Sequence, residues 1–255
     1  MFQAEFAAVI AAAKTKLEFL KRNPLGYFIA SMLAGAYIGF GILLIASIGG
    51  LLGSDPYAKI LMGASFGVAL SLVIMAGAEL FTGNIFTLSA GLFSKKVKFW
   101  DTLKLWIICC AGNWAGSIIL AAIFYAGGLA KGHVGEFIAE LSAAKMALPA
   151  VELFFRGMLC NTLVCLAVWC SFRCKSESAK LLMIFWCLLA FNVSSFEHSI
   201  ANMTLLTISL FAPFNAAINL AGYFYNILIV VLGNMAAGIF CVALPYYLIA
   251  RKNNK

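Results

Sequence analysis

The segment SSFEHSIANM, residues 194–203, places a glutamate, a histidine and an asparagine inside the long apolar run Leu181–Phe211. This run is too long for one simple crossing of a bilayer, and its polar centre predicts an interruption of the helix. Non-helical backbone at membrane depth is stable only where protein or water satisfies its polar groups, so the interruption should face a cavity inside the protein. The segment therefore predicts a broken transmembrane helix with a polar centre.

A second segment of the same kind lies in the first half of the chain. GAELFTGN, residues 77–84, interrupts the apolar run Ile60–Phe93. GNWAG, residues 112–116, follows it one span later, and GNMAAG, residues 233–238, follows SSFEHSIANM in the same order. A unit of three spans reverses its direction through the membrane when it is repeated, so the two halves should be inverted repeats.

Composition places the whole chain in a membrane. Hydrophobic residues make up 64% of the 255 residues, charged residues only 11%, and the mean hydropathy is +0.98, values that exclude a water-soluble domain. Lipid permits only helices or closed barrels, and the apolar runs are continuous rather than alternating, which favours helices. Six runs are long enough to span: Leu25–Leu52, Ile60–Phe93, Thr102–Leu129, Leu148–Phe172, Leu181–Phe211 and Ile218–Ala250. The predicted fold is an all-α membrane protein with six transmembrane helices, arranged as two inverted three-helix repeats whose second and fifth helices are broken.

The formal charge of +8 is distributed in a way that indicates membrane topology rather than binding of nucleic acid. Lysines and arginines gather before the first span, between the second and third, between the fourth and fifth, and after the last. By the positive-inside rule both termini and the two basic loops should face the cytoplasm. We expect a multi-pass protein of the bacterial cytoplasmic (inner) membrane, with lipid around it and no nucleic acid partner.

The first 24 residues carry apolar side chains at helical spacing with charge on the opposite face. This pattern is typical of an amphipathic helix along the cytoplasmic interface, although a helix packed on a neighbouring subunit fits it as well. The expected organisation is an interfacial helix (1–24), a first three-helix repeat (25–129), a periplasmic connection (130–147), a second repeat (148–250) and a cytoplasmic tail (251–255). Eight cysteines form no C-x-x-C motif, so we expect neither a metal site nor a cofactor.

His198 is the one histidine inside an apolar run. Ionisable residues within spans are costly and usually mark substrate or proton pathways, the alternative being a core histidine whose hydrogen bonds are satisfied. A neutral imidazole can donate a hydrogen bond to an anion, and a charged one can protonate it. The half-helices that restart after the two interruptions would aim their N-termini, each with about half a positive elementary charge, at mid-membrane, which favours an anion.

Three segments carry a resemblance to a known family: FEHSIANM at residues 196–203, AELFTG at 78–83 and LCNTLVCLAVW at 159–169. They are similar to signatures of the formate/nitrite transporter family of pentameric, aquaporin-like anion channels. NPLGYFIASMLAGAY at residues 23–37 and FWCLLAF at 185–191 look most similar to the nitrite channel subgroup. The resemblance implies a homopentamer and a small anion as substrate.

The resemblance also implies roles for single residues in the centre of a pore. His198 matches the central histidine of the motif E-H-x-x-A-N, in which Glu197 and Asn202 would orient the ring. Thr82 matches the threonine that faces this histidine across the pore, and Asn161 matches its amide partner.

Apolar residues of two constrictions follow from the same resemblance. Leu70, Leu80 and Phe191 match those of a cytoplasmic constriction, while Phe66 and Phe81 match those of a periplasmic one. Taken singly, such leucines and phenylalanines are ordinary core residues, and only the motifs indicate a pore role.

The expected function is therefore a channel or transporter for a small monovalent anion or its weak acid, with nitrite first and formate or hydrosulfide next. Arg156 and Lys145 are candidates for attracting the anion, although Lys145 could equally lie on a solvated face. The alternative is a channel for ammonia or another neutral small solute. An intramembrane enzyme with His198 and Glu197 as base and orienter is not expected, because no G-x-S-x-G element or pair of metal-ligand histidines accompanies them.

Overall fold

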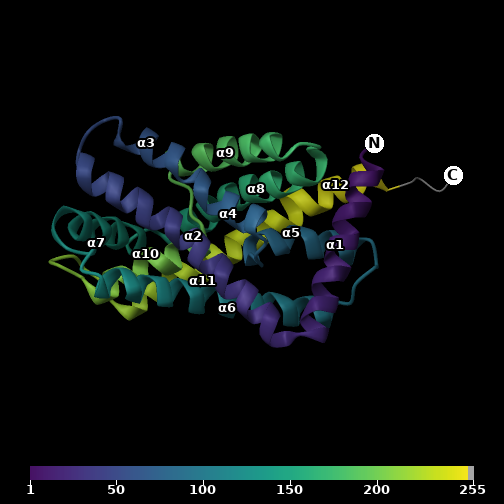
Figure 1. Ribbon diagram of the computed structural model, residues 1–255, viewed down its shortest axis with the longest axis horizontal. Coiled ribbons are helices and arrows are strands. Elements are labelled where there is room, and N and C mark those ends of the chain that lie inside the picture. Colours follow the sequence, from purple (N-terminus) through teal and green to yellow (C-terminus); the bar gives the residue numbers. More distant parts are fainter. Residues whose placement is uncertain (252–255) are drawn as a thin grey trace.

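The computed structural model describes residues 1–251, and these are almost entirely helical (Figure 1). No strand occurs within this part of the chain. The elements are α1 (Gln3–Arg22), α2 (Pro24–Leu52), α3 (Ala58–Ser65), α4 (Gly67–Ala76), α5 (Phe81–Phe93), α6 (Phe99–Ala126), α7 (Gly132–Met146), α8 (Ala150–Arg173), α9 (Glu177–Val193), α10 (Ser199–Phe211), α11 (Leu220–Ala236), the π-helical η1 (Ala237–Ala243) and α12 (Leu244–Ala250).

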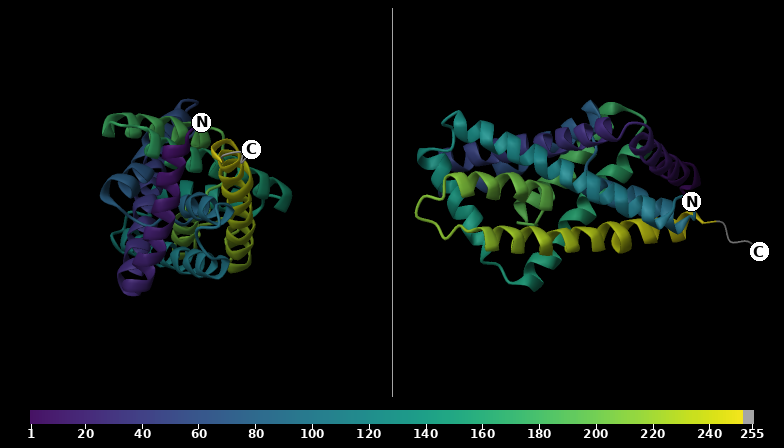
Figure 2. Two further views of the ribbon diagram at one scale, coloured as in Figure 1. Left: turned by 90° about the vertical axis from the view of Figure 1, so that its right-hand side faces the viewer. Right: turned by 90° about the horizontal axis from the view of Figure 1, so that it is seen from below.

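The helices make six crossings of the molecule's long axis within residues 1–251. α2, α6, α8 and the continuous stretch α11–η1–α12 cross unbroken, and Figure 2 shows that the last of these runs along most of the length of the molecule. The second crossing consists of α3 and α4 followed by α5, and the fifth consists of α9 followed by α10. By length and apolar composition, five stretches could each span a membrane, whereas α5 and α10 are shorter apolar helices. The predicted fold, with broken second and fifth helices, is confirmed.

Both breaks contain one residue in the left-handed backbone region. In the first break this residue is Gly77, at φ 78°, and in the second it is Ser195, at φ 57°. Glycine adopts this conformation at little steric cost, whereas a serine there is uncommon. The first break spans residues 77–80 and the second spans residues 194–198.

A buried asparagine holds the first break in place from the neighbouring helix. The Oδ1 atom of Asn113 in α6 accepts the backbone N–H of Phe81 at 2.9 Å. Its Nδ2 atom donates to the carbonyl oxygens of Ser31 at 2.7 Å and Glu79 at 2.8 Å. One amide side chain therefore satisfies backbone groups that the interruption leaves without helical partners.

Asn234 in α11 makes the same three contacts in the second repeat. Its Oδ1 atom accepts the N–H of Ser199 at 3.0 Å, and its Nδ2 atom donates to the carbonyls of Gly157 at 2.8 Å and Glu197 at 3.0 Å. The two asparagines belong to the GNWAG and GNMAAG motifs, so the repeated sequence corresponds to a repeated hydrogen-bond pattern.

Close helix contacts bring these asparagines to the breaks. A Cβ atom added to Gly116 in α6 would lie 1.9 Å from the carbonyl oxygen of Met32 in α2. A Cβ atom at Gly233 in α11 would lie 2.2 Å from the carbonyl oxygen of Phe154 in α8. Gly35 in α2 approaches the carbonyl oxygen of Asn113 equally closely, at 2.0 Å from an added Cβ atom, so glycines are required at the central crossing of each repeat.

The half-helices are exchanged between the repeats. α5 belongs to the first repeat but packs against α8 and η1 of the second, while α10 belongs to the second repeat and packs against α2 and α6 of the first. The two repeats therefore form one interlocked body rather than two adjacent bundles.

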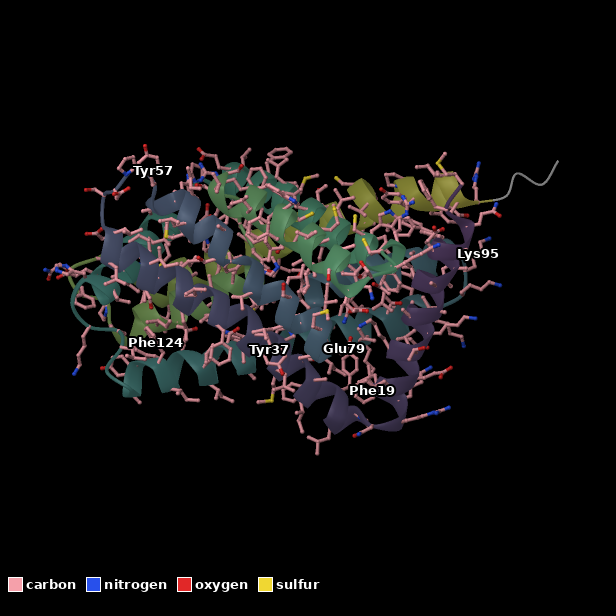
Figure 3. All side chains as sticks on the ribbon, turned by 45° about the horizontal axis from the view of Figure 1, so that its top comes forward. Phe19, Tyr37, Tyr57, Glu79, Lys95 and Phe124 are labelled. Carbon is pink, nitrogen blue, oxygen red and sulfur yellow. The ribbon has the colours of Figure 1, made fainter. Side chains whose placement is uncertain are left out.

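Two further helices each precede a repeat. α1 lies across the end of the molecule near α12 (Figure 1) and buries Phe6, Val9 and Leu17 against its own chain. α7 lies at the opposite end, inside the segment predicted only as a connection, and the side chains of Tyr57 and Lys95 mark these two ends in Figure 3. The apolar face of α1 is thus covered within the subunit.

Candidate functional site

The site lies where the two half-helices begin. The Oγ1 atom of Thr82, in the first turn of α5, lies 3.0 Å from the Nε2 atom of His198, the residue that precedes α10. Both side chains are buried, at 0% and 3% exposure. From this point α5 runs toward the end of the molecule that carries α1, and α10 runs toward α7 (Figure 1). Two helix N-termini therefore meet in the middle of the protein.

The hydrogen bonds of His198 fix the tautomer of its neutral ring. Its Nδ1 atom accepts the backbone N–H of Ala201 at 3.2 Å, so the imidazole is the N-cap of α10. A nitrogen that accepts carries no proton, which places the proton on Nε2 and directs it at the oxygen of Thr82. The hydroxyl of Thr82 keeps its own proton and can donate it to a further acceptor.

A narrow chamber lies beside this pair. Its cavity volume is about 10 Å³, close to the smallest space that holds one water molecule. His198 is the one polar residue in its lining, and Thr82 lies behind the imidazole without lining the chamber. The chamber is lined by Ile38, Phe66, Leu70, Leu80, Val164, Leu188, Phe191 and His198.

The chamber wall follows the symmetry of the repeats. Residues that hold the same place in the two repeats face each other across it in three pairs: Ile38 and Val164, Leu70 and Leu188, and Leu80 and His198. Two of the pairs are aliphatic on both sides. The second repeat therefore has His198 at the position where the first repeat has Leu80.

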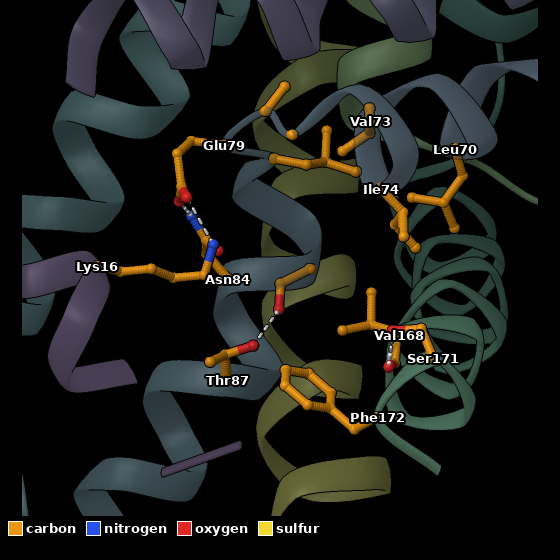
Figure 4. Close-up of a pocket in the computed structure, with 14 residues that line it drawn as sticks. Lys16, Leu70, Val73, Ile74, Glu79, Asn84, Thr87, Val168, Ser171 and Phe172 are labelled. Carbon is orange, nitrogen blue, oxygen red and sulfur yellow. Dashed lines mark hydrogen bonds and ion pairs between the residues drawn. The ribbon is translucent and has the colours of Figure 1, made fainter. Parts of the chain in front are cut away.

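Two larger cavities adjoin the chamber from opposite ends. The terminal vestibule, at the end of the molecule that carries α1, has a volume of about 420 Å³ and shares Leu70 and Leu80 with the chamber (Figure 4). The distal vestibule, at the opposite end, has a volume of about 480 Å³ and shares Phe66, Phe191 and His198 with it. The three cavities together form an interrupted path along the length of the subunit.

Phe66 and Phe191 lie together in one constriction, whereas they were expected in two different ones. The rings of Phe66 and Phe191 meet edge to face with centroids 5.4 Å apart, so both lie between the chamber and the distal vestibule. The ring of Phe191 also stacks on the imidazole of His198 at 6.2 Å. Phe191 was expected in the opposite constriction, with Leu70 and Leu80. Its position in the sequence does not show toward which side of the break its side chain points.

Phe81, expected in the periplasmic constriction, lines none of these three cavities. It is the first residue of α5, its backbone N–H is bound by Asn113, and its side chain is 3% exposed within the core. Consecutive residues at a helix start point in different directions. Leu80 faces the chamber, and Phe81 packs elsewhere.

Each break also carries a glutamate paired with a lysine. In the second break the Nζ atom of Lys145 lies 2.6 Å from Oε1 of Glu197, whose other oxygen accepts a hydrogen bond from Asn202 at 2.6 Å. Asn202 in turn donates to Asn226. Glu197 and Asn202 thus contact each other rather than the imidazole, and they fix the loop that carries His198.

The first break has an equivalent pair that the sequence analysis did not select. Lys16 of α1 lies 2.7 Å from Oε1 of Glu79, whose other oxygen accepts from Asn84 at 2.8 Å and Tyr27 at 3.1 Å. Lys16, Glu79 and Asn84 line the terminal vestibule (Figure 4). The shared spacing E-x-x-x-x-N, in ELFTGN and EHSIAN, was the available signal for Glu79 and Asn84, whereas nothing in the sequence indicated Lys16.

Asn161 and Arg156, two other residues predicted for the site, form no hydrogen bond with the imidazole of His198. Asn161 donates to the backbone oxygens of Thr82 at 3.3 Å and Asn234 at 2.7 Å, and its Oδ1 atom has no partner among residues 1–251. Arg156 lines the distal vestibule, and its Nη2 atom lies 3.0 Å from Glu152. The part of the chain that the structure describes holds no group of three His, Cys, Asp or Glu side chains suited to a metal ion.

A family model described as formate/nitrite transporter matches residues 3–248. The chain belongs to the formate/nitrite transporter family. The nitrite transporter NirC of Escherichia coli (strain K12) is 44% identical over 239 residues, covering 91% of this chain and 87% of that protein. This formate/nitrite transporter chain thus resembles the nitrite subgroup, as predicted, and its relatives are transporters and channels rather than enzymes.

Solved structures of the formate/nitrite transporter family support the fold. A structure described as an FNT family ion channel superposes with a TM-score of 0.93 at 40% identity, covering 98% of this chain and 100% of the other. A pentameric formate channel with formate bound superposes with a TM-score of 0.79 at 28% identity, covering 91% and 99%.

Proposed function

We propose that this chain forms a channel for a small monovalent anion or its weak acid, with nitrite as the first substrate and formate and hydrosulfide next. The observation that carries the proposal is the hydrogen bond from the Nε2–H group of His198 to Thr82, beside a chamber that is otherwise apolar. In this arrangement the Nε2–H group binds Thr82, which leaves the hydroxyl proton of Thr82 as the donor for an anion that has lost most of its water.

The proposed path begins in the distal vestibule and passes the rings of Phe66 and Phe191. A bare anion in such a dry constriction loses much more hydration energy than a few hydrogen bonds return. Donation from the Thr82 hydroxyl, oriented by His198, offsets part of this cost, and a solute that has already taken up a proton from water in the vestibule and enters as its neutral acid avoids most of it. The solute then leaves past Leu70 and Leu80 into the terminal vestibule.

Charged groups in the vestibules support the choice of an anion. Lys145 and Arg156 line the distal vestibule, and Lys16 lines the terminal one. Positive side chains at the mouth of a low-dielectric cleft raise the local concentration of an anion. In this proposal Lys145 also has a second role, because its contact with Glu197 holds the loop beside His198.

The proposed assembly is a homopentamer in the bacterial cytoplasmic membrane. A pentamer is the state named for the formate channel with 28% identity. Many large apolar side chains on the outer faces of the helices are exposed in the single subunit, which fits contact with lipid and with further copies. The basic segments before α2 and between α5 and α6 favour termini in the cytoplasm.

The decisive experiment measures nitrite flux into proteoliposomes for the wild type and for His198→Phe across a range of pH. The phenylalanine ring keeps the volume but removes the donor, so we expect a large loss of nitrite flux and a changed pH dependence in a variant that still assembles. Equal flux and equal pH dependence in the two proteins would exclude a central role for His198.

A neutral-solute or ammonia channel is tested in the same vesicles. Nitrite and formate should compete with each other for passage, because both are expected to use the same donors. If neither anion is transported while ammonia is, the alternative function holds and the proposal fails.

A further inference from the structure

The inverted repeats allow the walls of the two vestibules to be compared position by position. The shared polar set is a lysine, a glutamate and an asparagine in each wall, namely Lys16, Glu79 and Asn84 in the terminal vestibule and Lys145, Glu197 and Asn202 in the distal one. The lysine and glutamate of each set form an ion pair. These pairs are alike, so they give neither side an advantage in binding an anion.

At three other pairs of equivalent positions the residue in the second repeat is the more polar one. The distal vestibule has polar side chains where the first repeat has apolar residues or glycine: Asn192 in place of Ile74, Ser195 in place of Gly77, and Arg156 in place of Ala30. The equivalence of Arg156 and Ala30 follows from the backbone, since the carbonyl of each accepts the N–H of the glutamate of its break. The distal wall thus has added hydrogen-bond donors.

The donors of these three side chains are largely free. Among residues 1–251 the side chains of Asn192 and Ser195 make no hydrogen bond, and Arg156 uses only its Nη2 atom, toward Glu152. The terminal vestibule has two hydroxyl groups without distal equivalents, on Thr87 and Ser171, but both donate to helix carbonyls. Donors available to a solute are therefore concentrated in the distal vestibule.

The backbone brings the three residues to one place. The N–H of Ser195 donates to the carbonyl of Asn192 at 3.1 Å, which closes the turn after α9. The N–H of Glu197, two residues further, donates to the carbonyl of Arg156 at 3.2 Å. The distal vestibule also carries the cations Lys59, Lys145 and Arg156, of which Lys145 and Arg156 are paired with Glu197 and Glu152.

We infer that Asn192, Ser195 and Arg156 form an oxyanion-binding subsite in the distal vestibule, ahead of the ring of Phe66 and Phe191, and that the terminal vestibule has no equivalent. The subsite suits a small monovalent oxyanion such as nitrite or a carboxylate, whose oxygens accept from guanidinium, amide and hydroxyl groups at once. This inference rests on the proposed function and adds to it a sidedness in substrate binding. Hydrosulfide, which has no oxygen, should gain much less from these donors.

The test compares right-side-out with inverted membrane vesicles, which present opposite vestibules to the medium. For the wild type we expect the half-saturating formate concentration to be lower in the population that exposes the distal vestibule. The variant Asn192→Ile combined with Ser195→Gly installs the side chains of the terminal vestibule, and we expect it to raise that lower value about 10-fold by removing hydrogen bonds to a charged group. The value measured in the other population should not change.

Two further variants make the test specific. Arg156→Ala, at a partly exposed position where a folding defect is not expected, should produce the same one-sided rise. The reciprocal variant Ile74→Asn adds a donor to the terminal vestibule and should lower the half-saturating formate concentration on that side only. Hydrosulfide flux, measured in parallel, should be insensitive to Asn192→Ile/Ser195→Gly and to Ile74→Asn, and it should change much less than formate flux in Arg156→Ala.

Several outcomes would overturn the subsite. Equal half-saturating concentrations on the two sides of the wild type would do so, as would an unchanged value in both Asn192→Ile/Ser195→Gly and Arg156→Ala. An equal change in hydrosulfide flux would indicate an altered constriction instead. In each of these cases formate and nitrite still pass, so the proposed function stands, whereas absence of any flux of both anions in the wild type would remove the proposed function itself.

Discussion

At the scale of single residues, the bonding of His198 explains why its ring can act as a fixed donor. The imidazole is held on one side by the N–H of Ala201 and on the other by Thr82. A charged ring would need to donate from both nitrogens, and the Nδ1 proton would then face the N–H of Ala201. The N-cap contact therefore favours a neutral ring with its proton on Nε2.

Thr82→Val tests the second half of this pair. Valine preserves the shape of the side chain but removes the hydroxyl, which leaves the Nε2–H group of His198 without its partner. We expect nitrite flux in proteoliposomes to fall about 10-fold, the effect of losing one hydrogen bond to a charged or strongly polarised group.

Thr82→Ser is the matched control, because it keeps the hydroxyl and removes one methyl group. Its flux should stay within about two-fold of the wild type, a change of a few tenths of a kcal/mol. If Thr82→Val conducts as well as Thr82→Ser, the hydroxyl has no part in permeation.

At the scale of helices, each break is fixed by a neighbouring asparagine and by a lysine from the helix that precedes the repeat. Lys16 comes from α1 and Lys145 comes from α7. α1 is thereby connected to the first break through one partly buried ion pair, with 23% and 13% of the two side chains exposed. Removing one partner of such a pair costs more than it does at the surface, because the remaining charge stays partly buried without its counter-ion.

Lys16→Met tests this connection. Removing the lysine leaves Glu79 at the edge of the protein interior without its cation, so we expect a loss of stability of about 1–3 kcal/mol. Thermal unfolding of the purified oligomer, followed by size-exclusion chromatography, should show a lower midpoint. The double variant Lys16→Met/Glu79→Gln should recover part of the loss, because no unpaired charge is left. Additive losses in the two single variants would show that the two side chains do not interact.

The breaks themselves could be predicted from the sequence, because polar residues in the middle of a long apolar run have no stable place in an unbroken lipid-facing helix. The helix α7 was not predicted although the signal was present, since Val134, Phe137, Ile138 and Leu141 recur at helical spacing. The ion pair of Lys16 and Glu79 joins residues far apart in the chain, so it depends on the final packing. The position of Phe191 beside Phe66 depends on the direction in which the chain leaves α9, which spacing does not define.

At the scale of the whole molecule, the exchange of half-helices makes the two repeats mutually dependent. α5 lies against α8 and η1, and α10 lies against α2 and α6. The contact between Thr82 and His198 joins the two repeats at the centre. Neither repeat alone supplies the full set of helices against which its own half-helix packs.

A chain divided between residues 129 and 130 tests this dependence. The cut lies in the short loop between α6 and α7, so it removes no helix. We expect the first fragment expressed alone to be degraded or aggregated, and the two fragments expressed together to restore nitrite flux. A first fragment that is stable by itself in detergent, with a monodisperse elution profile, would contradict the interlocked arrangement.

The head-to-head start of α5 and α10 also sets an order of events during synthesis. When the ribosome has inserted residues 81–93, the partners of α5 in α8 and η1 have not yet been translated. The polar groups of the first break find partners in their own half, such as Lys16 and Asn113, whereas α5 itself stays without these packing partners until the second half of the chain emerges. An unfinished chain therefore presents a short, incompletely covered apolar helix that quality control in the membrane could recognise.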